Sequence, residues 1–218
     1  MSEPYYADEF VTLYHGDCRE ITEWLDADVL VTDPPYGIAV KTDWSERRPT
    51  AWAKGDRPIA GDEAAFDPEH LLAFRHAVIF GGNHFADRLP ASPDWLVWDK
   101  RRGGTLTPGW SAPDAELAWS NLGRGCRTFS HLWEGYKRDS EVGQHFHPTQ
   151  KPVALMQWAI GLAKSEGTVA DPYAGSGSTL VAAKRLGRRS IGVELDERYC
   201  EIAAKRLAQG VLNFAPSP

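Results

Sequence analysis

Short apolar runs alternate along the chain with segments whose apolar residues recur at helical spacing. The run over 28–33, "DVLVTD", is continuous and of strand length, which is typical of a strand buried on both faces of a parallel sheet. The segment over 151–165, "KPVALMQWAIGLAKS", has apolar residues at helical spacing and a proline that suits the first turn of a helix. The pattern predicts strands at 11–16, 28–33, 78–82, 94–100 and 115–120, helices at 18–26, 68–77 and 151–165, and then strand, Gly-rich loop, helix, strand and helix from 168 onward.

This alternation of strands and helices predicts an α/β fold with a doubly wound, mostly parallel sheet. Two stretches, 38–67 and 100–146, interrupt the alternation and are rich in Gly, Pro, Trp and basic residues. Long irregular loops in a compact domain usually serve a function or are disordered. The chain of 218 residues is long enough for one domain with a good core. We expect a single domain over 1–218 with loop insertions at 38–67 and 101–146.

Composition and charge restrict the class of protein further. No apolar run approaches the ~18 residues that span a bilayer, and the N-terminus lacks the apolar stretch of a secretory signal. Cys18, Cys126 and Cys200 are odd in number and far apart, which favours a reducing compartment over a disulfide framework. The net charge of −6 argues against a surface coated in positive charge, although a local basic patch is compatible with it. We expect a cytoplasmic protein without a membrane partner.

A glycine-rich loop joins a strand and a helix in "VADPYAGSGSTLVAAKRLG". The strand ends at Asp171, and Gly175 and Gly177 let the backbone approach a ligand. The helix that begins near Ser178 offers free N–H groups. The next strand ends at Glu194, 19 positions after Gly175, near the roughly 20 residues at which a dinucleotide fold places its ribose-binding acid. A Gly-rich turn alone would be unremarkable in an α/β protein, but this ordered set favours a nucleotide-like cofactor.

NAD is the obvious alternative cofactor for such a loop. Its G-x-G-x-x-G/A pattern is only partly met, because Leu180 stands at the third glycine position. Asp171 would be poorly placed beside a pyrophosphate and suits a cationic or amine-bearing cofactor better. A NAD-dependent oxidoreductase is therefore a distant alternative. His145 and His147 lack further ligands nearby in the sequence, so we expect no metal.

A second set of candidate residues follows the buried strand over 28–33. Asp33 ends this strand, so its carboxylate should lie at the carboxyl edge of the sheet, where open α/β folds bind ligands. Pro34 and Pro35 make the turn rigid, and Pro34 offers a carbonyl group. Tyr36 supplies a flat face. Two acceptors and an aromatic ring fit a planar ring with an exocyclic amine, although a strand-ending turn with a packed tyrosine would have the same sequence.

The motifs occur in the order found in a known family. The segments "YHGDC", "DPPYG", "FGGNH", "WDK", "HPTQKP", "DPYAGSGST" and "GVELDERY" resemble the amino-methylating DNA methyltransferases that use S-adenosylmethionine, in the permuted (beta) order with the catalytic motif before the cofactor motif. Each motif alone is weak, but the ordered set is specific and covers nearly the whole chain. The resemblance implies a Rossmann-like methyltransferase sheet whose strands three to seven come from the N-terminal part and strands one and two from the C-terminal part.

The resemblance also implies where S-adenosylmethionine binds. Asp171 would lie near its amino group and Glu194 would hold its ribose, with Asp17 near the adenine moiety. Thr149 and Lys151, at the start of the helix over 151–165, would bind the methionine carboxylate. The expected cofactor-binding residues are Asp17, Thr149, Lys151, Asp171, Tyr173, Gly175, Gly177, Ser178, Glu194 and Leu195.

By the same resemblance, Asp33, Pro34, Pro35 and Tyr36 form the catalytic turn. Asp33 and the Pro34 carbonyl would accept the N–H groups of a base flipped out of the duplex and direct its lone pair at the methyl group, while Tyr36 stacks on the ring. An aspartate at this place goes more often with adenine and a serine with cytosine, so we expect methylation of adenine N6. Cytosine N4, RNA and a protein side-chain amide are the alternative substrates on this fold, and a DNA-binding module without catalysis is the non-enzymatic alternative.

Basic residues cluster in the two insertions, where they would contact the phosphates of double-stranded DNA despite the acidic total. The insertion over 38–67 should close over the flipped base. The insertion over 101–146 is the candidate target-recognition region, and its short length predicts a short or loosely specified site. Restriction–modification, regulation and phage self-protection are all compatible with the family, in bacterial or phage-infected bacterial cells. A homodimer is compatible with it too, since permuted relatives often pair. The expected DNA-binding residues are Arg47, Arg48, Lys100, Arg101, Arg102, Lys137 and Arg138.

Overall fold

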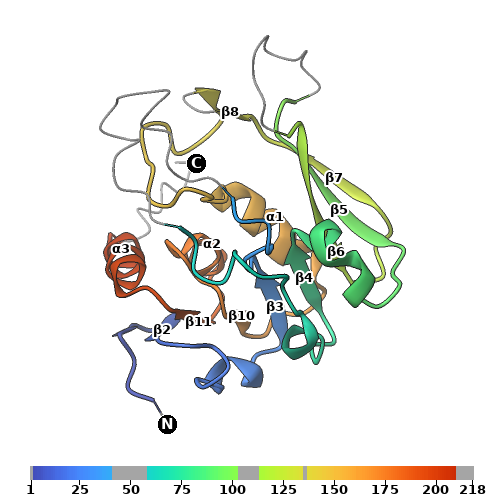
Figure 1. Cartoon of the computed structure of the whole chain (residues 1–218). Coiled ribbons are helices and arrows are strands. Elements are labelled where there is room, and N and C mark those ends of the chain that lie inside the picture. The colour runs from blue at the N-terminus through green and yellow to red at the C-terminus, as the bar shows by residue number, and fades with distance from the viewer. Residues whose placement is uncertain (1, 41–57, 103–112, 135–136, 210–218) are drawn as a thin grey trace.

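One large sheet forms the centre of the computed structural model, which describes residues 2–40, 58–102, 113–134 and 137–209 (Figure 1). The strands of this sheet are β1 Tyr6–Ala7, β2 Val11–His15, β3 Val29–Thr32, β4 Ala77–Phe80, β5 Asp94–Asp99, β6 Ala115–Ser120, β7 Arg127–Ser130, β10 Val169–Asp171 and β11 Ser190–Glu194. Their order across the sheet is β1-β2-β11-β10-β3-β4-β6-β5-β7. Two further strands, β8 Trp133–Glu134 and β9 Lys137–Arg138, pair as a separate antiparallel ribbon.

The strands of the sheet are mostly parallel. β2, β11, β10, β3 and β4 run in one direction, and β6 runs antiparallel to both of its neighbours, β4 and β5. β3 and β4 are buried along their whole length, as their continuous apolar sequences predict. The late strands β10 and β11 lie between the early strands β2 and β3, so the permuted, doubly wound order predicted from the sequence is confirmed (Figure 1).

The two faces of the sheet are covered differently. Three α-helices, α1 Val153–Leu162, α2 Ser178–Arg185 and α3 Glu197–Ala208, pack on one face, where Leu155, Ala182 and Ala203 are buried against strand residues. Short 3₁₀ segments lie among the loops of the other face, where Trp24 and Phe85 are buried. None of the helices in the described ranges is long and apolar enough to cross a bilayer. The 3₁₀ segments are η1 Glu23–Asp26, η2 Glu69–Leu71 and η3 Gly82–Arg88.

Two of the predicted α-helices, at 18–26 and 68–77, are wrong. In the first, the buried indole of Trp24 donates a hydrogen bond to the Cys18 carbonyl, an acceptor that a helix would need for its own backbone. In the second, Asn121 donates to the Phe74 carbonyl and accepts from the Ala77 backbone N–H, which holds the chain extended into β4. Tertiary packing therefore overrides the local helical preference at both places.

A core substitution on α2 tests this packing. Leu180 is fully buried against β2 and α3, and we expect Leu180→Ala to lower the free energy of unfolding by about 2–5 kcal/mol because it leaves a cavity. Leu186, at the end of the same helix, is 43% exposed, and Leu186→Ala should cost less than about 0.5 kcal/mol. Urea unfolding followed by circular dichroism measures both, and equal losses would contradict the assigned core.

Candidate active site

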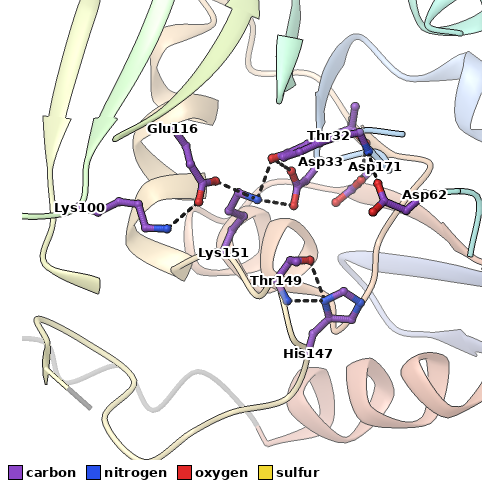
Figure 2. Close-up of polar contacts among 10 residues, drawn as sticks. Thr32, Asp33, Asp62, Lys100, Glu116, His147, Thr149, Lys151 and Asp171 are labelled. Carbon is purple, nitrogen blue, oxygen red and sulfur yellow. Dashed lines mark hydrogen bonds and ion pairs between the residues drawn. The ribbon is translucent and has the colours of Figure 1, made fainter. Parts of the chain in front are cut away.

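The ends of neighbouring strands bring acidic residues to one edge of the sheet. Glu194 ends β11, Asp171 ends β10 and Asp33 follows β3. Since these strands are parallel and adjacent, their carboxyl ends lie side by side. The antiparallel strand β6 begins at the same edge and adds Glu116, which no pattern in the sequence had singled out. Figure 2 shows Asp33, Glu116 and Asp171 at this edge, with Lys151 between the first two.

Asp33 is held by two donors. The Lys151 ammonium donates to Oδ2 at 2.6 Å (Figure 2). The Tyr36 hydroxyl donates to Oδ1 at 2.7 Å. Burial raises the pKa of Asp33, and the Lys151 charge opposes that rise. A carboxylate has about four lone-pair sites, so each oxygen of Asp33 can still accept a hydrogen bond from a ligand.

Lys151 makes a second ion pair on its other side. Its Nζ lies 3.3 Å from Glu116 Oε2, while Lys100 Nζ lies 2.7 Å from Glu116 Oε1. Burial works against the charged form of Lys151, but Asp33 and Glu116 hold its pKa well above the ordinary value. Burial likewise would raise the pKa of Glu116, yet the two lysines lower it to about 2. Negative and positive charges therefore alternate along this group of four side chains.

The Lys151 ammonium contacts the turn after β3 through Asp33. Its binding to the methionine carboxylate stays a prediction. Thr149, assigned the same role, contacts the Nδ1 atom of His147 through its hydroxyl at 3.1 Å. Burial lowers the pKa of His147 to about 3, so this ring is neutral. The segment before α1 thus lies between the turn after β3 and the loop after β10.

Asp62 fixes the turn that follows Asp33. The residue is 4% exposed, although it stands in the insertion over 38–67. Its Oδ2 accepts the Val40 backbone N–H at 2.7 Å, and its Oδ1 accepts three more from Tyr36, Gly37 and Ile38, at 3.0, 2.9 and 3.3 Å. One carboxylate therefore binds four backbone donors of the turn. An isolated acid in a loop gives no signal of this role in the sequence.

The ring of Tyr36 is fixed by two residues of the "FGGNH" segment. A Cβ atom at Gly81 would lie 2.0 Å from Cε1 of the ring, and the φ of Gly81 is +71°, so glycine is required there. His84 stacks on the ring with centroids 4.9 Å apart and an interplanar angle of 16°. His84 is itself exposed. The imidazole thus lies at the solvent side of the catalytic turn, next to the aromatic ring predicted to stack on a base.

The glycine loop is tied to the neighbouring strand by an acid. Glu194 accepts the Gly175 backbone N–H at 2.7 Å through Oε2 and the Asp196 N–H at 2.8 Å through Oε1. Burial raises the pKa of Glu194. Gly177 adopts a left-handed conformation, φ +81°, at the start of α2, where no side chain caps the helix. An added Cβ at Gly175 would meet nothing closer than 3.8 Å, so the loop leaves room for a ligand.

Asp171 lies between the loop and the catalytic turn. It is 2% exposed, and its Oδ1 accepts from the Thr32 hydroxyl at 2.8 Å and from the Tyr173 N–H at 3.2 Å. Burial raises its pKa to about 6. The strand ends at this edge carry carboxylates, which bind hydroxyl, amine and cationic groups and would repel a pyrophosphate. These carboxylates fit a positively charged cofactor with a ribose better than a dinucleotide.

The remaining predicted cofactor residues are more dispersed. Asp17 is exposed and accepts the Arg19 backbone N–H at 2.8 Å. The Tyr173 hydroxyl lies 2.8 Å from Nε2 of His70. Ser178 is buried at the start of α2, whereas the side chain of Leu195 is 54% exposed. Across the described ranges, no group of three or more His, Cys, Asp or Glu residues is arranged to hold a metal ion.

The predicted DNA-binding residues fall into three groups. Lys100 and Arg101 are mostly buried in ion pairs, Lys100 with Glu116, and Arg101 with Asp114 and Glu134. They therefore form a wall of the site rather than an exposed basic patch. Arg102 and Lys137 are exposed, and the Arg138 guanidinium lies over the ring of Trp133. Arg47 and Arg48 lie outside the described residues.

Comparisons with known proteins agree on one class. The family model N6_N4_Mtase, described as DNA methylase, matches residues 94–205. The chain is 42% identical to the Type II methyltransferase M2.LlaDCHI of Lactococcus lactis subsp. cremoris, over 96% of this chain and 94% of the relative. Among solved structures, the PvuII DNA methyltransferase (cytosine-N4-specific) covers 99% of this chain and 91% of its own with a TM-score of 0.58 at 14% identity. The complex of M1.HpyAVI with SAM covers 90% and 98%, with a TM-score of 0.52 at 23% identity.

Removal of the Asp62 carboxylate should loosen the turn. Asp62→Ala leaves four backbone donors without their charged acceptor, and we expect the free energy of unfolding to fall by at least about 2 kcal/mol. Hydrogen–deuterium exchange should accelerate at residues 36–40. Asp67→Ala is the control, since Asp67 is exposed and accepts from the N–H of Glu69. Unchanged exchange at the turn would contradict this role.

The raised pKa of Asp171 predicts a stability that depends on pH. The folded protein binds the Asp171 proton more tightly than the unfolded chain does. Ionisation of this carboxylate therefore lowers the free energy of unfolding, fully above the folded pKa of about 6 and not at all below the pKa of the unfolded chain. The difference between the two pKa values corresponds to roughly 3 kcal/mol. We therefore expect Asp171→Asn to raise the free energy of unfolding at about pH 8 by ~1–3 kcal/mol, and by less at about pH 5.

Urea titrations at the two pH values measure this difference. Asp26→Asn, at an exposed acid of η1, is the control and should change little at either pH. An equal gain for Asp171→Asn at both pH values would show that ionisation of the buried carboxylate is not its source.

Proposed function

Since the chain belongs to the N6/N4 DNA methylase family, we propose that it methylates the exocyclic N6 amine of an adenine flipped out of double-stranded DNA. At the level of the family, the protein is a site-specific Type II DNA methyltransferase and S-adenosylmethionine is its cofactor. The observation that carries the proposal is the partly buried carboxylate of Asp33, which is held at the carboxyl end of β3 and can accept further hydrogen bonds.

The choice of adenine rests on the residue at the start of the turn. Adenine and cytosine both present an amine beside a ring nitrogen, and a cytosine-N4-specific enzyme shares this fold. The fold therefore does not select the base. Aspartate at this position, as in Asp33, goes more often with adenine in the family that the chain resembles. Cytosine N4 is the alternative.

The catalytic turn activates the amine by position and charge. An exocyclic amine is a poor nucleophile, because its lone pair is delocalised into the ring. We propose that Asp33 and the Pro34 carbonyl accept its two N–H groups, which favours a tetrahedral nitrogen with its lone pair directed away from the turn. Pro35 and Asp62 keep the turn rigid while this happens. Tyr36 and the stacked His84 provide the aromatic surface for the base.

Asp33 is also the proposed acceptor of the proton that the amine loses. The Lys151 ammonium favours the ionised form of Asp33 against the effect of burial, so the carboxylate can both bind the amine and accept its proton. Bound S-adenosylmethionine supplies a methyl group on a positively charged sulfur. Asp171, Glu194 and the loop glycines are the proposed residues around it, on the acid-lined side of the site.

Contacts with DNA are proposed for the two insertions of a single domain. Arg102, Lys137 and Arg138 are the described candidates for phosphates, and Arg47 and Arg48 extend the set. Extrusion of a base costs a few kcal/mol, and stacking returns ~1–3 kcal/mol per base. Lys100 and Arg101 are better explained as wall residues because they are engaged with acids.

The test is transfer of a labelled methyl group from S-adenosylmethionine to unmethylated duplex DNA, with digestion to nucleosides. We expect N6-methyladenine, and a loss of at least about 100-fold in kcat for Asp33→Ala, because the preorganised acceptor is gone. Asp26→Asn is the control, since this exposed acid precedes β3 whereas Asp33 follows it. Formation of N4-methylcytosine would show that the target base is cytosine and not adenine. No transfer to DNA, with cofactor binding intact, would indicate RNA or a protein side-chain amide as the substrate.

A further inference from the structure

Glu116 is a charged residue in the wall of the site that the chemistry described above does not use. Its side chain is 23% exposed, but its Oε2 atom is out of contact with solvent and lies 3.3 Å from the Lys151 ammonium. Lys100 holds its Oε1 at 2.7 Å. Each oxygen of the carboxylate thus faces a lysine ammonium. The backbone is also fixed, since the strand register places Glu116 opposite Trp98 in β5 and the Lys100 N–H donates to the Asp114 carbonyl.

The charge that develops on the target amine gives Glu116 an electrostatic effect. As the amine gains a methyl group it becomes positively charged, so the site must present a net negative charge to it. Asp33 and Lys151 alone would form a neutral pair, and the ammonium would repel the cation that develops. Glu116 adds the second negative charge on the far side of Lys151, and Figure 2 shows the ammonium between the two carboxylates.

We propose that Glu116 is a positioning residue for methyl transfer: it holds Lys151 from the side away from Asp33 and offsets the charge of the ammonium, which leaves Asp33 a net negative charge for the amine. This inference rests on the proposed function. It acts through Lys151, whose side chain is 4% exposed and pairs with Asp33 and Glu116. Lys100, at 15% exposure, keeps Glu116 in place and is screened by solvent more than Lys151 is.

A positioning role differs from a structural one in the pH dependence. The groups that act on Asp33 are Lys151, Tyr36, Glu116 and, from β10, Asp171. Glu116 raises the pKa of Asp33, so removal of its charge should lower that pKa. The acid limb of kcat, which reports ionisation of Asp33, should then move to lower pH even as the maximal rate falls. Loss of packing alone would reduce the rate without moving the limb.

The decisive variant is Glu116→Gln, measured for kcat across pH on duplex DNA. We expect kcat at its plateau to fall at least about tenfold, the acid limb to move to lower pH, and the KM values for DNA and S-adenosylmethionine to change by less than about threefold. In a Lys151→Met background the same substitution should cost less than about twofold, because no ammonium remains to be offset. Glu116→Asp keeps the charge and should keep the limb near the wild-type position.

Two further variants keep the result interpretable. Asp94→Asn makes the same acid-to-amide change in β5, at the opposite end from Lys100, where Asp94 accepts the backbone N–H groups of Gly123 and Gly125. It should leave the limb in place. Lys100→Met draws Lys151 toward Glu116 and should move the limb to higher pH, so it tests the proposal even if Glu116→Gln fails to fold.

Two outcomes overturn the inference while leaving the proposed function intact. In the first, Glu116→Gln or Lys100→Met leaves the acid limb unmoved. In the second, the losses from Glu116→Gln and Lys151→Met multiply in the double variant. Wild-type protein that transfers no methyl group to DNA would overturn the proposed function and this inference with it.

Discussion

The ion pair between Asp33 and Lys151 is the interaction on which the site depends. It joins side chains 118 positions apart and fixes the turn after β3 against the start of α1. Two charges taken out of water cost several kcal/mol each, and their attraction repays this only with good geometry and further hydrogen bonds. Tyr36 and Glu116 supply those partners. Such a pair contributes little to stability over an apolar pair of the same size, so the proposed function accounts for it better than stability does.

Different residues fix different parts of the turn around Asp33. Asp62 binds the backbone donors of the turn from behind, Pro34 and Pro35 restrict its dihedral angles, and Gly81 leaves space for the ring of Tyr36. The acceptors on the other side of the turn are then preorganised for a ligand. On the proposed function, little reorganisation would be needed when the target amine binds, which is how electrostatic preorganisation lowers a barrier.

Much of this arrangement could be predicted from the sequence, because parallel strands end at one edge. The apolar run before Asp33 and the strand before Asp171 are readable, and their order implies adjacency. The partners of these acids were not readable: Glu116 is a single acid in a short strand, and Asp62 a single acid in a loop. Lys151 could be placed at a helix start, but whether it faces the cofactor or Asp33 depends on contacts between distant segments. The 3₁₀ segment at Trp24 was missed for the same reason, since one side-chain hydrogen bond displaced a helix.

The placement of β10 and β11 between β2 and β3 also affects how the protein is made on the ribosome. The early strands β2 and β3 are not neighbours in the finished sheet. The hydrogen bond from Thr32 to Asp171 spans 139 positions. β3 must wait with one edge unpaired until the last third of the chain is synthesised. Sheets closed by such distant pairings form slowly and expose strand edges on the way. A nascent chain of this protein would therefore complete the proposed site only near the end of translation, when β10 and β11 insert between β2 and β3.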